Sequence, residues 1–103
     1  MTKGYWIAQI DVSDPEGYKT YIAANAVAFA KFGARFLTRG PAREVPEGHA
    51  RSRIVTIEFP SLQAAQDCYH SPEYSAAKAL RLGRSVGDLA IIEGYDGPQP
   101  GDA

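Results

Sequence analysis

Residues 53–73 of the chain, RIVTIEFPSLQAAQDCYHSPE, contain one strand pattern followed by two helix starts. The first seven residues of this stretch are rich in β-branched and aromatic types, which is typical of a β-strand. Pro60–Ser61 ends that strand and can cap a short helix that continues to about Tyr69. Ser71–Pro72 repeats the start signal and predicts another helix, which continues to about Leu82.

The segment before this stretch predicts a strand, a helix and a second strand. Residues 4–12 are rich in aromatic and β-branched types, as strands are. Asp14–Pro15–Glu16 indicates a helix start, because the aspartate can cap free amides and proline suits the first helical position. An apolar stripe follows this start at helical spacing: Tyr18, Ile22, Ala26 and Phe29. That helix ends at Gly33, residues 34–40 form the second strand, and residues 41–51 contain two prolines and form a loop.

The C-terminal part completes the pattern. Residues 88–95 predict a fourth strand, and the glycine- and proline-rich residues 96–103 are expected to be a disordered tail. The order is β-α-β-β-α-β, with the second helical region broken in two. We therefore predict a single domain over residues 1–95 with an α+β, ferredoxin-like fold, in which helices cover one face of a four-stranded antiparallel sheet.

Composition excludes several classes of protein. A net charge of −1 and a pI of about 6.1 argue against a nucleic-acid partner. Cys68 is the one cysteine, so an intrachain disulfide is impossible, and no signal-peptide pattern opens the chain. No apolar stretch approaches the ~20 residues of a membrane helix. We therefore expect a cytoplasmic protein with no membrane partner.

The predicted sheet has two unequal faces. One is uniformly apolar and suits the space beneath the helices: Trp6, Ala8, Ile10, Val12, Val55, Ile57 and Phe59. The other is mixed, yet too apolar to be left in water: Tyr5, Ile7, Gln9, Asp11, Ile54, Thr56 and Glu58. A second copy of the same sheet, related by a two-fold axis, would cover this mixed face. The sequence therefore predicts a homodimer.

Several short motifs, taken in order, match one family. They are Lys3-Gly4-Tyr5-Trp6, Asp14-Pro15-Glu16, Gly33-Ala34-Arg35-Phe36-Leu37, Arg39-Gly40, Ile57-Glu58-Phe59-Pro60-Ser61, and Tyr69-His70-Ser71-Pro72-Glu73-Tyr74 with Lys78 and Arg81. Through them the chain resembles the domain-of-unknown-function family 1330, a branch of the dimeric α/β-barrel proteins, from residue 3 to about residue 95. Pro41 and His70 depart from the usual family pattern. The resemblance implies the fold and a barrel-like dimer but no activity, because relatives in the wider superfamily include monooxygenases, isomerases, haem-handling enzymes and ligand binders.

Two charged residues of the predicted sheet are candidates for the function. Arg39 lies near the end of a strand, where its guanidinium can bind a carboxylate or an enolate. The alternatives are an exposed arginine or a partner for Glu58. Glu58 lies inside an apolar strand, where burial would raise the pKa of its carboxyl and suit a catalytic proton shuttle. A salt bridge to an arginine on a neighbouring strand is the other interpretation.

Aromatic residues and a histidine complete the candidates. Tyr69 and Tyr74 flank the break between the two short helices, and their hydroxyls can bind a ligand in a cavity or can belong to the core. Trp6 can likewise stack on a flat ligand or pack internally. His49, in the loop before the third strand, is a candidate acid–base group, although a solvated loop histidine is the more common situation. Ser71 has the place of a helix cap rather than of a nucleophile.

The sequence leaves two functions open. No metal spacing, phosphate loop or nucleotide fingerprint is present, so we expect neither a metal nor a cofactor. The first function is a dimer that binds a small acidic or aromatic molecule and can act as a cofactor-free enzyme; it predicts that one set of side chains converges on a cavity, namely Arg39, Glu58, Tyr74 and His49. The second is a non-catalytic ligand sensor or interaction scaffold, in which the same residues pair with one another and leave no room.

Overall fold

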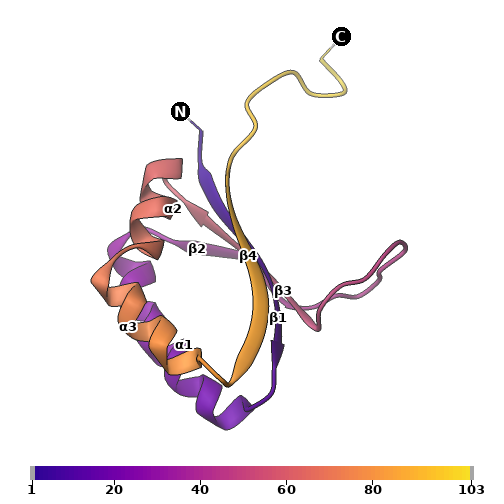
Figure 1. The fold of residues 1–103 in the computed structure, drawn as a ribbon. Helices are drawn as coiled ribbons and strands as arrows, with labels where there is room; N and C mark the ends of the chain where they lie inside the picture. The colour runs from indigo at the N-terminus through magenta and orange to yellow at the C-terminus, as the bar shows by residue number, and fades with distance from the viewer. Residues whose placement is uncertain (1, 103) are drawn as a thin grey trace.

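The computed structural model describes residues 2–102. Its elements are β1 (Gly4–Val12), α1 (Pro15–Lys31), β2 (Arg35–Pro41), β3 (Arg53–Phe59), α2 (Leu62–Tyr69), α3 (Pro72–Arg81) and β4 (Ser85–Glu93). The four antiparallel strands lie in the order β2-β3-β1-β4. All three helices cover the same face of this sheet (Figure 1). The predicted element order and the α+β, ferredoxin-like fold are confirmed.

The last strand differs from the predicted range of 88–95, because β4 begins at Ser85 and ends at Glu93. Its first residues continue the pairing with β1 as far as the Val12–Ser85 pair. Gly87 belongs to this ladder because β1 comes very close: a Cβ there would lie 2.7 Å from the Gln9 carbonyl oxygen. Glycine is required here because the two strands approach each other closely, and it does not interrupt the strand.

The tail beyond β4 extends away from the domain (Figure 1). Its contacts are local: the Tyr95 hydroxyl donates to the Pro98 carbonyl at 2.8 Å, and the Gln99 amide donates to Asp102 at 2.8 Å. The disorder expected for residues 96–103 stays a prediction, and residue 103 lies outside the described residues.

All three expected helix caps are present. The Asp14 carboxylate accepts the Gly17 amide at 3.1 Å and begins α1. The Ser61 hydroxyl accepts the Ala64 amide at 3.0 Å and begins α2. The Ser71 hydroxyl accepts the Tyr74 amide at 3.1 Å, which separates α3 from α2 and explains the break in the second helical region. Ser71 is therefore a structural cap, as its position indicated.

Trp6 is the centre of the core between sheet and helices. Only 1% of its surface is exposed. Its indole N–H donates to the carbonyl of Ala65 in α2 at 2.8 Å, so the buried donor is satisfied. Four aromatic rings from α1, β3, α2 and α3 surround the indole at centroid distances of 4.9 to 5.7 Å: Phe29, Phe59, Tyr69 and Tyr74. The apolar face predicted to lie beneath the helices does so.

Helix α1 is turned relative to the predicted apolar stripe. Ala26, which the helical spacing placed on the inward stripe, is exposed. The buried residues of this helix are Tyr18, Tyr21, Asn25, Ala28 and Phe29. The helix therefore brings three polar side chains to the space above the sheet, where each needs a hydrogen-bond partner.

The opposite face of the sheet is open in the described chain, and no helix covers it (Figure 1). Large apolar side chains on this face remain exposed: Ile7 by 38%, Val86 by 59% and Ile92 by 55%. The loop between β2 and β3 projects on this side, away from the helices (Figure 1). The mixed composition predicted for this face is confirmed, and so is its exposure in a single chain.

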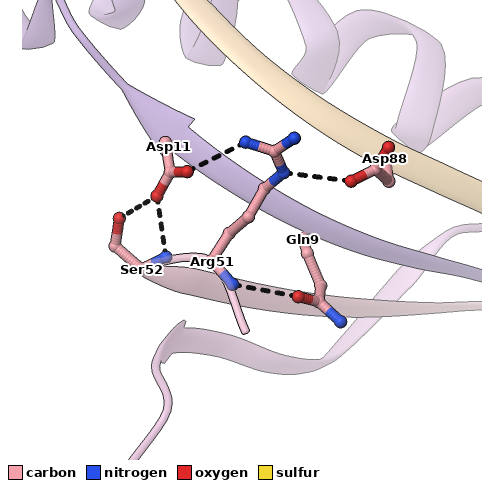
Figure 2. Close-up of polar contacts among 5 residues, drawn as sticks. All are labelled: Gln9, Asp11, Arg51, Ser52 and Asp88. Atoms are coloured by element: carbon pink, nitrogen blue, oxygen red, sulfur yellow. Dashed lines mark hydrogen bonds and ion pairs between the residues drawn. The ribbon is translucent and has the colours of Figure 1, made fainter. Parts of the chain in front are cut away.

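A polar cluster fixes the base of that loop to the open face (Figure 2). The Arg51 guanidinium donates to Asp11 of β1 at 2.9 Å and to Asp88 of β4 at 3.0 Å. The Arg51 amide donates to the Gln9 side chain at 3.0 Å, and the Ser52 amide donates to Asp11 at 2.9 Å. Hydrogen bonds from Ser52, together with the Arg51 charge, hold the pKa of the Asp11 carboxyl below its usual value.

No helix within residues 2–102 has both the length and the apolar character to cross a membrane.

A substitution at Gly4 tests how closely β1 and the start of α2 are packed. A Cβ at this position would meet the Ser61 carbonyl oxygen and lie 2.6 Å from the Leu62 Cα, both backbone atoms that cannot turn away. We expect Gly4→Ala to lower the free energy of unfolding by about 1–3 kcal/mol, as other overpacked sites do. Urea denaturation of the variant measures the loss.

Gly40→Ala is the matched control, because nothing lies within 4 Å of a Cβ at Gly40. This variant should stay within about 1 kcal/mol of the wild type. Equal losses in both variants would contradict the close junction.

Candidate functional site

A cavity opens between α1, α3 and the helix-covered face of the sheet. It encloses about 80 Å³, and about 710 Å³ when its open mouth is included. Its inner walls are apolar, formed by side chains that include Trp6, Ile10, Phe29, Phe36, Val55 and Ile57. An enclosed space of this size is smaller than the ~150 Å³ apolar cavity that takes up a benzene molecule. The cavity therefore suits a compact ligand whose remaining atoms lie in the mouth.

Three arginines from three elements line the cavity: Arg39 of β2, Arg53 of β3 and Arg81 of α3. None of them takes part in the five ion pairs formed among residues 2–102. All three are near the hydroxyl group of Tyr18. Burial raises the pKa of this hydroxyl, and the three guanidinium charges oppose that rise. The site thus gathers positive charge next to an apolar wall.

A β-bulge in β2 turns Arg39 toward the cavity. Phe36 pairs with Ile57 on the helix-covered face, and Thr38 pairs with Thr56 on the open face. The extra residue between them shifts the register, so Arg39 pairs with Val55 and returns to the face of Phe36. The Arg39 guanidinium lies 4.6 Å from the centre of the Phe36 ring, which holds it over the mouth.

Helix periodicity places Arg81. It follows Tyr74 by seven residues, or two turns, with buried Ala77 between them on the same side of α3. The Arg81 guanidinium lies 5.7 Å from the centre of the Tyr21 ring and beside the Tyr74 hydroxyl, whose pKa it lowers. This arginine is therefore the inner one, and Arg39 is exposed at the rim.

The one acidic residue that lines the cavity has its carboxylate on the other face of the sheet. Asp88 pairs with Gln9 in the strand register, so its side chain points to the open face. There its carboxylate is 3.0 Å from Arg51 Nε (Figure 2). Arg51 in turn contacts Asp11 as well. Asp88 therefore forms no ion pair with the three arginines of the cavity within residues 2–102.

A pair of tyrosines lies between α1 and α3. The hydroxyl oxygens of Tyr21 and Tyr74 are 2.7 Å apart in a buried hydrogen bond. Burial raises the pKa of both groups. The side-chain amide of Asn25, which is 7% exposed, opposes the rise in the pKa of Tyr21. Both hydroxyls remain protonated at neutral pH and can serve as hydrogen-bond donors.

The candidates from the sequence divide into two groups. Arg39, Tyr74 and Trp6 line the cavity, although the Trp6 N–H is already used by a backbone carbonyl. Tyr69 packs against Trp6 instead, and its hydroxyl accepts a hydrogen bond from Lys78 at 2.9 Å.

Glu58 and His49 do not converge on the cavity, contrary to expectation. Glu58 lies on the open face, where it accepts a hydrogen bond from the Tyr5 hydroxyl at 3.0 Å rather than pairing with an arginine. The strand alternation that buries Ile57 and Phe59 necessarily turns Glu58 away from the helices. His49 lies exposed in the projecting loop. Neither side chain reaches the cavity within the chain, and neither is proposed as a catalytic residue.

Sequence reasoning did not select several lining residues for the site, namely Tyr18, Tyr21, Asn25, Arg53 and Arg81. The three on α1 follow each other at spacings of three and four, which is the signature of one inward face carrying polar atoms. The spacing of Arg81 from Tyr74 carried a similar signal. No such signal marked Arg53, because the face of the sheet to which its side chain points depends on the strand register.

The model of the family described as "Domain of unknown function (DUF1330)" matches residues 3–95. The chain belongs to this family. The match confirms the resemblance that the sequence motifs indicated. No curated protein matches the chain.

Solved structures share the DUF1330 chain's fold at low sequence identity. A protein of unknown function from Rhodopseudomonas palustris is 15% identical, with a TM-score of 0.75 over 93% of this chain and 85% of its own. SnoaB, described as a cofactor-independent oxygenase from Streptomyces nogalater, is 15% identical, with a TM-score of 0.63 over 97% and 99%. An ethyl tert-butyl ether D family protein from Bacillus halodurans is 15% identical, with a TM-score of 0.60 over 92% and 100%. Identities this low establish the fold and no activity.

The described part of the chain contains no cluster of metal ligands. Within residues 2–102, no three side chains of His, Cys, Asp or Glu lie close enough together to hold a metal ion. The polar side chains that line the cavity include its three arginines, the hydroxyl groups of its tyrosines and Asn25.

The tyrosine pair makes stability of this DUF1330 protein depend on pH in the alkaline range. Folding raises the pKa values of Tyr21 and Tyr74. The stabilisation that comes from keeping both phenols protonated is therefore complete below the pKa of about 10 that tyrosine has in the unfolded chain. It is lost as the pH rises through the higher pKa values of the folded protein. We expect the wild type to lose more stability between about pH 9 and pH 11 than a Tyr21→Phe/Tyr74→Phe variant. Urea denaturation across that range measures the difference.

Tyr95→Phe is the control, since this side chain is 70% exposed. It should follow the wild-type profile. Parallel profiles for the double variant and the wild type would contradict the burial of the pair.

Proposed function

We propose that the protein binds a compact organic anion, a carboxylate or an enolate with an apolar or aromatic body, in the cavity between helices and sheet. The observation that carries this proposal is the set of three arginines that form no ion pair among residues 2–102 and that line a cavity with largely apolar inner walls. Guanidinium groups bind carboxylates through paired, charge-assisted hydrogen bonds, and a nearby low-dielectric wall strengthens such bonds. An anion in the mouth would supply the charge that these side chains lack.

The alternative of an interaction scaffold has less support. It requires the polar candidates to pair with one another and to fill the space between helices and sheet. Arg39 and Glu58 instead point to opposite faces of the sheet, and a cavity with an open mouth lies beside Arg39. Binding without catalysis remains within the proposal, because the anion site requires no reaction.

A cofactor-free enzymatic activity is the second candidate function. Its support is the combination of two buried phenol hydroxyls, one amide and one inner guanidinium on the cavity wall, which together can hold and stabilise a reactive oxyanion. SnoaB is described as a cofactor-independent oxygenase on the same fold. This likeness is an analogy of fold, so the reaction is not carried over.

Calorimetric titration with benzoate and with phenylpyruvate, at low ionic strength, tests the anion site. We expect both acids to bind to the wild type and benzyl alcohol, which carries no charge, to bind far more weakly. Arg39→Ala should weaken binding of the acids about tenfold or more, because a hydrogen bond to a charged group contributes about 1.5–3 kcal/mol. Arg39→Ala combined with Arg53→Ala should remove it.

Arg35→Ala is the matched control, because Arg35 lies on the same strand but opposite Glu58 in the strand register, so it faces away from the cavity. It should bind both acids as the wild type does. Failure of the wild type to bind either acid, or equal effects of Arg35→Ala and Arg39→Ala, would refute the proposal.

We further propose that the protein works as a homodimer, with the open face of the sheet as the contact. The support is the row of large side chains exposed on a face that no helix covers, Ile7, Val86 and Ile92. The loop anchored by Arg51 projects on the same side and would lie against the second copy (Figures 1 and 2). The cytoplasmic location indicated by composition stays a prediction.

A charge placed in the open face should dissociate the dimer. Ile7→Asp and Ile92→Asp each put a carboxylate where the second copy would bury it, and an unpaired buried charge costs several kcal/mol. We expect sedimentation velocity at low micromolar concentration to find the wild type as a dimer and both variants as monomers.

Val27→Asp is the control, because Val27 is 62% exposed on α1, on the other side of the molecule. It should leave the dimer unchanged. A monomeric wild type would sink this part of the proposal.

A further inference from the structure

The tyrosine pair offers the cavity one hydroxyl proton that the protein does not use. A single hydrogen bond of 2.7 Å joins the hydroxyls of Tyr21 and Tyr74, and it can employ only one of their two protons. No other acceptor for either hydroxyl is found among residues 2–102. Both side chains line the cavity, so the remaining O–H donor belongs to the wall of the space that a ligand would occupy.

Either hydroxyl of the pair can be the donor of this bond. When Tyr21 donates to Tyr74, the Tyr74 proton is free, and Tyr74 is the hydroxyl that Arg81 lies beside. An anion next to Arg81 favours this arrangement, because it places a free O–H donor at the Tyr74 end of the pair.

Arg81 adds charge at that end. Its guanidinium lies beside the Tyr74 hydroxyl and over the Tyr21 ring, 5.7 Å from the ring centre. A phenol donor and a guanidinium donor side by side, fixed by packing before any ligand arrives, form an arrangement that stabilises an oxygen anion. The other two arginines, Arg39 of β2 and Arg53 of β3, line the cavity from the sheet, whereas Arg81 lines it from α3.

We propose that the Tyr74 hydroxyl and the Arg81 guanidinium bind the oxyanion of an enolate or phenolate, so that the ligand is an enolisable keto acid or a hydroxyaromatic acid. This inference rests on the proposed anion site and names its ligand class. The carboxylate of such a ligand lies at the rim with Arg39 and Arg53, and its second, ionisable oxygen lies inside. The two charged ends account for positive groups on two sides of one cavity, Arg39 and Arg53 on the sheet and Arg81 on α3.

The chemistry needs no further reactant. A neutral phenol or enol that binds as its anion releases one proton to solvent, and no other bond forms or breaks. Because the inner donors interact more strongly with O⁻ than with O–H, the site lowers the pKa of the bound ligand. For a keto acid, the same preference raises the bound fraction of the enolate.

The charged and titratable groups around the inner donors come from every element packed against them. Tyr18 and Tyr21 belong to α1, Tyr69 to α2, Arg39 and Arg53 to strands β2 and β3, and Asp88 to β4. The one carboxylate among them is paired with Arg51. The surroundings of a bound oxyanion are therefore positive, which favours the ionised ligand.

Binding of 4-nitrophenol to the full chain tests the inference, because its phenolate absorbs visible light and its phenol does not. The absorbance of the saturated complex across pH gives the pKa of the bound phenol. We expect a value about one to three pH units below that of free 4-nitrophenol. Tyr74→Phe should reduce this shift by about one unit, because one donor to the anion is lost. Tyr21→Phe should reduce it less, because Tyr74 keeps its proton.

Benzoate separates this inference from the anion site on which it rests. Tyr74→Phe should bind benzoate with wild-type affinity, which also verifies that the variant is folded. Tyr69→Phe is the matched control, since its hydroxyl contacts Lys78 outside the cavity, and it should keep the full shift. Benzoate binding without any shift for bound 4-nitrophenol, or an unchanged shift in Tyr74→Phe, overturns the oxyanion site alone. Failure of benzoate to bind overturns the anion site as well.

Discussion

The packing around Trp6 is the constraint on which the rest of the structure depends. Its indole ring contacts aromatic rings of α1, β3, α2 and α3, and its N–H is bonded to the α2 backbone. One side chain thereby fixes all three helices at a set distance from the sheet. The same side chain lines the cavity and forms part of its apolar wall. A smaller side chain at this position would let the layers approach and would change the shape of the site.

The arginines of the chain have two different environments, and the difference defines the site. Arg51 and Arg84 are bound to carboxylates: Arg51 to Asp11 and Asp88 on the open face, Arg84 to the cap of α1 at 2.8 Å. Such exposed pairs contribute little to stability, but they fix the loop base and the helix start. Arg39, Arg53 and Arg81 surround an apolar space and form no ion pair among residues 2–102. Their charge is available to a ligand, and the pairing of Asp88 elsewhere keeps it so.

Local patterns were sufficient for the fold. Proline and serine or aspartate at the helix starts, glycine after helices and apolar alternation in the strands each have a local physical cause, and they agreed with one another. The errors lay where tertiary contacts override local preference. The predicted last strand began at residue 88 and left out Gly87, although β1 requires glycine beside its Gln9 carbonyl. Ala26 was placed inward although α1 is turned to bury Tyr21 and Asn25.

The site was predicted only in part, for the same reason. The sequence by itself determined the element order, the helix caps, the apolar face under the helices and the presence of Arg39 and Tyr74 in positions that can reach a ligand. The tertiary structure decided which polar groups meet. A one-residue bulge turns Arg39 inward, strand alternation turns Glu58 outward, and antiparallel packing of α1 on α3 joins hydroxyls 53 residues apart. Register and helix rotation depend on the fit of the whole core, which no local stretch of sequence contains.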